Sequence, residues 1–63
     1  MTLEAVWFKN GKEIYWVDPV LETRTTDSFG PLNIEVYNGY HWYSAADCWE
    51  APDDFVIRVK KED

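Results

Sequence analysis

Apolar and polar residues alternate over several short stretches of this chain, which is the pattern expected of half-buried β-strands. The clearest stretch covers residues 32–44, where two alternating runs flank the dipeptide Asn38-Gly39. Asn-Gly is typical of a two-residue type I′ turn, because both residues tolerate the positive φ angles that this turn requires. We therefore expect an antiparallel hairpin here.

A two-residue turn gives this hairpin two unlike faces. The expected cross-strand pairs are Tyr37–Tyr40, Val36–His41, Glu35–Trp42 and Ile34–Tyr43. One face is then mainly apolar and suits a core, with Leu32, Ile34, Val36, His41 and Tyr43. The other face is polar and aromatic, with Asn33, Glu35, Tyr37, Tyr40 and Trp42. We interpret the second face as a candidate recognition surface.

A second pair of turn residues, Asn10-Gly11, predicts another hairpin with strands over residues 3–9 and 12–18. The residues expected on one apolar side are Leu3, Ala5, Trp7, Ile14 and Trp16, with Trp7 opposite Ile14 and Ala5 opposite Trp16. The opposite side carries Val6, Phe8, Tyr15 and Val17. That side is too apolar to be fully wet, so we expect it to pack in part against another strand or a short helix.

Further elements are expected after the first hairpin and after the second. They are an extended stretch over residues 20–26, a loop over 27–31, a short helix over 45–51 and a last strand over 55–60. Ser44 and Asp47 resemble a capping box at the start of the helix. Pro52 ends the helix, because proline cannot continue the hydrogen-bond ladder.

These elements predict a mainly β fold, a small α+β unit in one domain spanning residues 1–63. We expect about five antiparallel strands on two Asn-Gly hairpins, with one short helix before the last strand. A curved sheet or a partly open barrel would bury such strands, and the order of elements resembles an SH3-like barrel in outline. An open sheet with the helix on one face is the alternative. The peptide-binding motif of eukaryotic SH3 domains is absent, so this resemblance implies no ligand.

Charge and cysteine content narrow the class of partner. Twelve acidic residues stand against six basic ones, a net charge of −6, so nucleic acid and anionic lipid are repelled and a basic protein surface is attracted. Solubility alone would explain this charge equally well.

Cys48 is the only cysteine, which excludes an intrachain disulfide and fits a reducing compartment. Because no leader-like or membrane-spanning apolar run occurs, we expect a cytoplasmic location in a bacterial host.

The chain offers few residues for catalysis or metal binding. His41 is the only histidine, and a Cys48–His41 pair is conceivable, but such chemistry also needs an orienting group, an oxyanion hole and a cleft. Zinc requires three or four Cys and His ligands, and no EF-hand or glycine-rich phosphate loop occurs. We therefore expect no enzyme activity, no metal and no cofactor. We interpret His41 as a sheet residue and Cys48 as a small buried one.

Two features remain as candidate binding sites. The first is the aromatic face with Tyr37, Tyr40 and Trp42, which either covers the helix or the first hairpin, or stays exposed and marks an interface. The second is an acidic cluster, with Asp47, Glu50, Asp53 and Asp54. The predicted helix places the first two on one face, where the cluster either imitates phosphates toward a basic channel or is simply solvated.

The segment Trp49–Lys60 reads WEAPDDFVIRVK and is similar to the helix-to-strand end of a small host RNA polymerase inhibitor made by T7-like phages. The similarity covers about a dozen residues with a one-residue gap before Pro52, and it does not extend to the central hairpin. In that family, two basic residues of the last strand contact the polymerase. The resemblance therefore implies that Arg58 and Lys60, at the matching places, contact a partner.

We therefore expect a small acidic protein-binding module without enzyme activity, of the kind that phages and mobile elements use to inhibit a host nucleic-acid-processing or defence enzyme. Its predicted contact residues are Glu35, Tyr37, Tyr40, Trp42, Asp47, Glu50, Asp53, Asp54, Arg58 and Lys60. One alternative is a structural or assembly subunit that forms a homodimer through the aromatic face. The other is a single-stranded nucleic-acid binder, which the negative charge disfavours.

Overall fold

The computed structural model describes residues 2–26 and 30–60 and has a mainly β fold. Its six strands are β1 (Thr2–Lys9), β2 (Lys12–Val17), β3 (Glu22–Thr25), β4 (Ile34–Tyr37), β5 (Trp42–Ser44) and β6 (Asp54–Lys60). Two short 3₁₀ helices are η1 (Gly30–Asn33) and η2 (Ala45–Asp47), and the described residues contain no α-helix. Of the loop predicted over 27–31, residues 27–29 lie outside the described part, and Gly30 begins η1.

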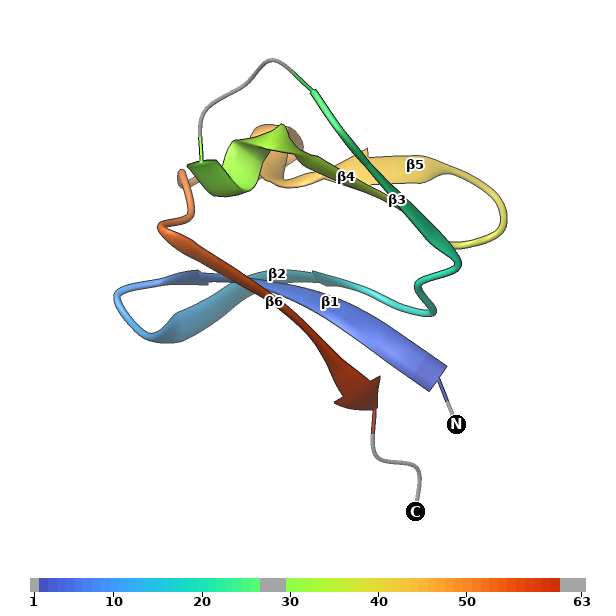
Figure 1. Ribbon diagram of the computed structural model, residues 1–63. Helices are drawn as coiled ribbons and strands as arrows, with labels where there is room; N and C mark the ends of the chain where they lie inside the picture. Colours follow the sequence, from blue (N-terminus) through green and yellow to red (C-terminus); the bar gives the residue numbers. More distant parts are fainter. Residues whose placement is uncertain (1, 27–29, 61–63) are drawn as a thin grey trace.

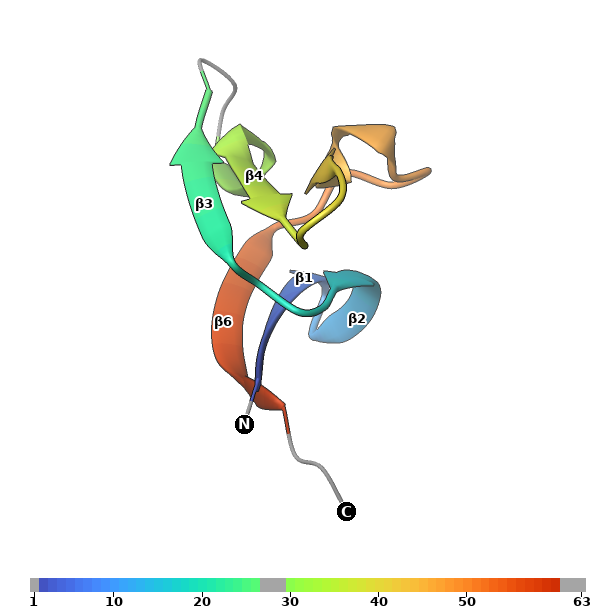
Figure 2. The same cartoon turned by 90° about the vertical axis from the view of Figure 1, so that its right-hand side faces the viewer.

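The strands form two antiparallel sheets that pack face to face as two layers (Figure 1). Sheet A has the strand order β2-β1-β6, and sheet B has the order β3-β4-β5. Six strands are described where about five were expected, and the sheets do not close into a barrel within the described residues. The chain leaves sheet A after β2, turns at the cis peptide bond between Asp18 and Pro19, and enters sheet B as β3. Figure 2 shows this crossing from one layer to the other.

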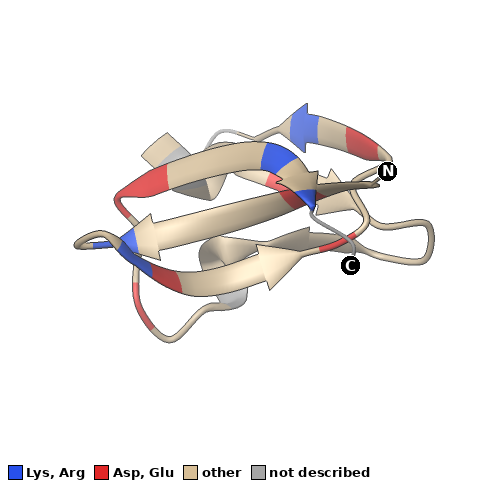
Figure 3. Cartoon of the chain, turned by 90° about the horizontal axis from the view of Figure 1, so that it is seen from below, with Lys and Arg blue, Asp and Glu red and all other residues tan. Residues whose placement is uncertain are grey.

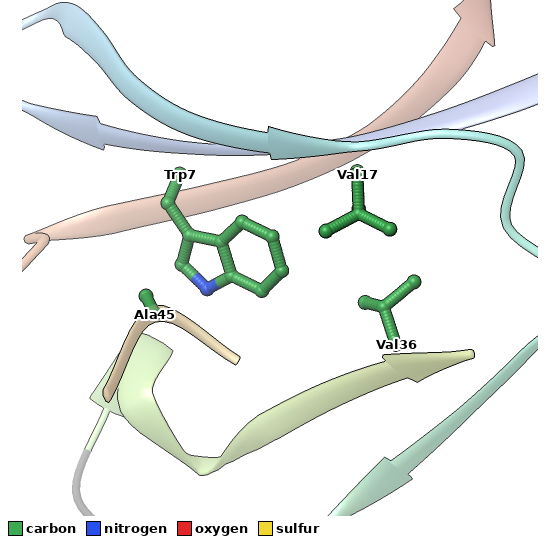
Figure 4. Packing of buried hydrophobic residues seen from close by; sticks show 5 residues of the cluster. Trp7, Val17, Val36 and Ala45 are labelled. Atoms are coloured by element: carbon green, nitrogen blue, oxygen red, sulfur yellow. The ribbon is translucent and has the colours of Figure 1, made fainter. Parts of the chain in front are cut away.

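The core lies between the two sheets and is small. Its buried residues are Ala5, Trp7, Val17, Val36 and Ala45. Trp7 is fully buried, and its ring centroid lies 5.3 Å from that of Tyr15 and 4.9 Å from that of Phe55. Figure 4 shows Trp7 and Val17 pointing from sheet A toward Val36 and Ala45. One large aromatic side chain therefore contributes much of the contact between the layers.

The first hairpin has the predicted turn but not the predicted register. Asn10 and Gly11 have φ angles of 53° and 78°, as a type I′ turn requires. Lys9 pairs with Lys12 and Phe8 with Glu13, but a bulge follows between Trp7 and Phe8. Beyond the bulge the register is Trp7–Tyr15, Val6–Trp16 and Ala5–Val17. The predicted pairs Trp7–Ile14 and Ala5–Trp16 are therefore wrong, because the extra residue turns Tyr15 and Val17 into the core and Trp16 outward.

The second hairpin has a longer loop than predicted. Tyr37 pairs with Trp42 and Val36 with Tyr43, so residues 38–41 form the loop, and His41 is not a strand residue. The Asn38 side chain accepts hydrogen bonds from the backbone N–H groups of Tyr40 (2.9 Å) and His41 (3.1 Å). Such local bonds compete with a tight turn. The register moves by two residues, which leaves each side chain of the strands on its predicted face.

The predicted helix over 45–51 is also shorter in the structure. Only η2 forms, and Ser44 caps it by accepting a hydrogen bond from the Ala46 N–H at 3.3 Å. The cap therefore lies where it was predicted, but the segment that follows η2 is irregular. Cys48 packs against the core but is only partly buried, whereas Trp49 is 84% exposed. A single helical turn is held by few hydrogen bonds, so it does not extend into a longer helix unless the following residues pack against the fold.

Candidate functional site

The outer face of sheet B carries a compact group of aromatic and charged side chains. We define the aromatic patch as Arg24, Tyr37 and Trp42. The ring centroids of Tyr37 and Trp42 lie 5.1 Å apart, and the Arg24 guanidinium lies 4.0 Å from the Trp42 centroid. The strand pairing produces this arrangement, because Tyr37 is opposite Trp42 while Arg24 is opposite Glu35 on the neighbouring strand pair.

Contacts to neighbouring groups hold the side chains of the patch in place. The Arg24 Nε donates a hydrogen bond to Glu35 Oε1 at 2.6 Å, and the Tyr37 hydroxyl donates to the Gly39 carbonyl oxygen at 3.0 Å. The cation–π contact between the Arg24 guanidinium and the Trp42 ring contributes about 0.5–1 kcal/mol of interaction energy at such an exposed position. The patch is therefore a half-exposed surface whose side chains have few alternative rotamers, which lowers the entropy lost when a partner binds.

Tyr40 extends the aromatic surface beyond the sheet. It sits in the loop between β4 and β5 and is 84% exposed. The Asn38 side chain fixes the backbone of this loop through its two hydrogen bonds. An exposed tyrosine on an ordered loop is a typical contact residue in protein interfaces.

The predicted acidic cluster does not form one helical face. The segment after η2 is not helical, and the structure describes the backbone of Asp47 but not its side chain. Glu50, Asp53 and Asp54 follow one another toward the start of β6. Asp53 has a structural contact, since its Oδ2 accepts a hydrogen bond from the Asn10 N–H at 3.1 Å. This bond fastens the segment before β6 to the β1–β2 turn.

Arg58 and Lys60 belong to β6 of sheet A, whereas the aromatic patch lies on sheet B. Figure 3 shows that the strands carry Lys and Arg positions as well as Asp and Glu positions. Arg58 donates to Glu4 on β1 at 3.3 Å and to Glu13 on β2 at 2.8 Å, while Lys60 Nζ lies 3.0 Å from Asp18 Oδ2. Partial desolvation acts to lower the pKa of Arg58, but its hydrogen bond to Glu4 and the negative charges of Glu13 and Glu4 outweigh this effect and raise the pKa. Arg58 therefore joins all three strands of sheet A with a permanent positive charge.

The ten predicted contact residues thus occupy three separate places. Glu35, Tyr37 and Trp42 come together on sheet B, with Tyr40 in the adjoining loop. Glu50 and Asp53 lie beside the β1–β2 turn, and Asp54, Arg58 and Lys60 belong to β6 of sheet A. The structure therefore does not bring all ten together on one face.

Sequence reasoning missed Arg24 and two surface grooves. Arg24 could be found only from the pairing of β3 with β4, which is a long-range contact. One groove of about 200 Å³ lies between β2 and the β4–β5 loop, lined by Tyr15, Trp16, Val17, Asp18, Asn38 and Tyr43. A wider groove beside the β1–β2 turn includes Trp49, Lys9 and Lys12. The bulge in β2 turns Tyr15 toward the core and Trp16 outward, and no alternation pattern reveals a bulge in advance.

The residues considered for catalysis have other contacts. The His41 ring meets the Tyr43 ring edge-on at 6.1 Å, and the Cys48 thiol donates to the Ile14 carbonyl oxygen at 3.9 Å. No group of three or more His, Cys, Asp or Glu side chains within the described residues is placed to hold a metal ion. No helix in this part of the chain has the length and apolar character needed to cross a membrane.

Comparisons with known proteins give no relative from which a role could be transferred. No protein-family model, curated protein or solved structure matches the chain.

Proposed function

We propose that this protein is a non-enzymatic protein-binding module that contacts its partner through the aromatic patch and Tyr40. The observation that carries the proposal is the pair of adjacent rings, Tyr37 and Trp42, on the outer face of sheet B, held by Arg24. Tyrosine, tryptophan and arginine are the residues most enriched among binding hot spots. Because their positions are fixed before binding, little additional ordering is required.

We further propose that the two sheets together form an SH3-like, partly open barrel. Two features support this description. β2 and β3 are nearly consecutive yet belong to different sheets, and the 3₁₀ helix η2 precedes a last strand that pairs with the first. A barrel of this kind leaves loops and one outer face free to bind, although fold alone does not identify a ligand.

The partner that we propose is a protein with a basic surface, such as a host enzyme that processes nucleic acid or acts in defence. The net charge of −6 supports this class, as do the exposed carboxylates Asp53 and Asp54. Opposite charges raise the association rate and make binding sensitive to salt. An inhibitor of the kind used by phages and mobile elements fits these properties.

An affinity pull-down from bacterial lysate at low and high salt tests the proposal. The tagged protein is compared with a Tyr40→Ala/Trp42→Ala variant and with a Trp49→Ala variant. Trp49 is a matched control because it is as exposed as Tyr40, at 84%, but does not belong to the patch. We expect a stoichiometric partner whose recovery falls at least about tenfold with the double variant and remains unchanged with Trp49→Ala.

Two outcomes would contradict this function. Equal recovery of the partner by the wild type and the double variant would remove the patch from the interface. Recovery that does not change with salt would remove the basic-surface partner while leaving a protein-binding role through the aromatic rings. Circular dichroism of each variant verifies that the sheets remain folded.

A further inference from the structure

Strand β6 forms a free edge of sheet A. The strand order β2-β1-β6 places it at the border, and no strand among residues 2–26 and 30–60 pairs with its outer side (Figure 2). Two of its core-facing side chains remain exposed, Ile57 at 42% and Val59 at 52%, beside Leu3 of β1 at 42%. Figure 1 shows the reason, because the ends of β1 and β6 nearest the termini extend away from sheet B. An exposed apolar edge strand is a template for pairing with another strand.

The sequence of β6, DFVIRVK, is complementary to itself when it is read in the opposite direction. If two copies run antiparallel with Ile57 opposite Ile57, then Phe55 is opposite Val59 on the core-facing side. Asp54 is opposite Lys60 on the other side, and each of these pairs occurs twice by symmetry. Opposite charges and large apolar side chains in direct cross-strand positions both stabilise a sheet.

We propose that β6 pairs antiparallel with β6 of a second copy of this protein, so that two A sheets join into one continuous sheet around a two-fold axis at Ile57. The interface is isologous, as in most homodimers. The aromatic patch lies on sheet B and is not needed for this contact, so the dimer and the proposed binding function stand independently.

The charges favour this register over its neighbours. A shift by two residues that places Val56 opposite Val56 puts Asp54 opposite Arg58 and leaves Lys60 and Val59 without partners on the second strand. The opposite shift places Arg58 directly opposite Arg58, and like charges in this position are destabilising. Only the register centred on Ile57 pairs the whole strand and covers both exposed side chains.

Existing contacts of the two charged residues are compatible with pairing. Asp54 Oδ1 accepts a hydrogen bond from the Phe55 N–H at 2.8 Å, and pairing would exchange this local bond for the lysine of the second copy. Lys60 Nζ lies 3.0 Å from Asp18 Oδ2 on the β1 side of β6, and pairing would exchange this ion pair for the Asp54 carboxylate of the second copy. The contact involves one strand and few apolar side chains, which places it among small, weak interfaces. The dimer is therefore expected to dissociate on dilution.

A charge-swap experiment by sedimentation velocity tests the proposal, at protein concentrations from about 10 µM to about 1 mM. Asp54→Lys places two lysines opposite each other at both ends of the interface, and Lys60→Asp places two aspartates there. We expect each single variant to weaken the dimer about tenfold or more, because two attractive pairs become repulsive. An equimolar mixture of the two variants restores both pairs, and we expect it to form a heterodimer at wild-type strength.

The mixture distinguishes pairing from damage to the fold, because two misfolded variants cannot rescue each other. Rescue would support the register centred on Ile57. Weakening by Asp54→Lys but not by Lys60→Asp would overturn that register in favour of the shifted one. A wild-type protein that remains monomeric at about 1 mM would overturn the dimer itself. A dimer lost in the Tyr40→Ala/Trp42→Ala variant would instead assign self-association to the aromatic patch, and this result would also overturn the proposal.

Discussion

Replacing Val36 with alanine tests whether sheet B is held to sheet A by one buried side chain. Val36 is fully buried and, among the described residues of sheet B, is the largest side chain in that state. It points toward Trp7 and Val17 from the opposite layer (Figure 4). The substitution removes two methyl groups from this contact without adding a polar atom.

The expected loss in the free energy of unfolding is about 3 kcal/mol. Two methyl groups account for about 1.6 kcal/mol of transfer free energy, at about 0.8 kcal/mol each. A cavity of about 50 Å³ adds about 1.2 kcal/mol at about 24 cal/mol per Å³. A chain of this length has a total stability of about 3–9 kcal/mol, so the variant would be close to its unfolding threshold even at low temperature.

Urea unfolding followed by tryptophan fluorescence and by circular dichroism measures this loss. Val59→Ala is the matched control, because the same two methyl groups are removed from a side chain that is 52% exposed. We expect that control to lose less than about 1 kcal/mol when measured at about 1 µM, where the dimer proposed above is dissociated. For both variants, the slope of the free energy of unfolding against urea concentration should equal that of the wild type. Equal losses in the two variants would refute the packing argument.

Three further predictions concern the turns and the exposed aromatic residues. In urea titrations, Gly39→Asn should lower the free energy of unfolding by about 1–3 kcal/mol, because the φ angle of Gly39 is 106° and the added Cβ would lie 3.3 Å from the Leu21 side chain. The control Gly30→Asn, at a φ angle of 54°, should lower it by less than about 1 kcal/mol. Asp53→Ala should lower the free energy of unfolding by about 1 kcal/mol through loss of the hydrogen bond to the Asn10 N–H, whereas Asp53→Asn keeps an acceptor and should lower it less. Equal losses in the two variants would show that this hydrogen bond does not contribute to stability. Trp49→Ala should change the free energy of unfolding by less than about 0.5 kcal/mol and remove the emission most accessible to acrylamide, and a larger loss of stability would mean that Trp49 packs against the fold.

The hairpin faces could be predicted from the sequence, but the registers could not. The alternation around Asn38-Gly39 correctly placed Leu32, Ile34, Val36 and Tyr43 against the core. The turn itself was wrong, because the Asn38 side chain binds two backbone N–H groups and opens the loop. The faces survived only because the register moved by two residues, an even number. In the first hairpin a single bulge residue shifted the faces instead.

The candidate site was predictable only where it lies within one hairpin. Tyr37 and Trp42 share a face because they belong to adjacent strands joined by a short loop. Arg24 reaches them from β3, which lies outside that hairpin in the sequence, and pairing of this kind depends on the whole fold. The same reason explains why the sequence could not distinguish a curved sheet from a partly open barrel, and why the division of the strands into two three-stranded sheets was not expected. Local alternation tells which residues a strand buries but not which strand covers them.

The central position of β1 in sheet A has a consequence for the synthesis of this protein on the ribosome. β1 is made before the other described strands, whereas its second neighbour in sheet A, β6, is the last of them to be made. At about 5–20 residues per second, synthesis of residues 10–60 takes about 3–10 s, which is longer than most small domains need to fold. Throughout that interval Trp7 has no contact with Phe55, and the backbone edge of β1 that later pairs with β6 can pair with other nascent chains. Chaperone binding to the unfinished chain should therefore concentrate on its first strand and end when β6 emerges.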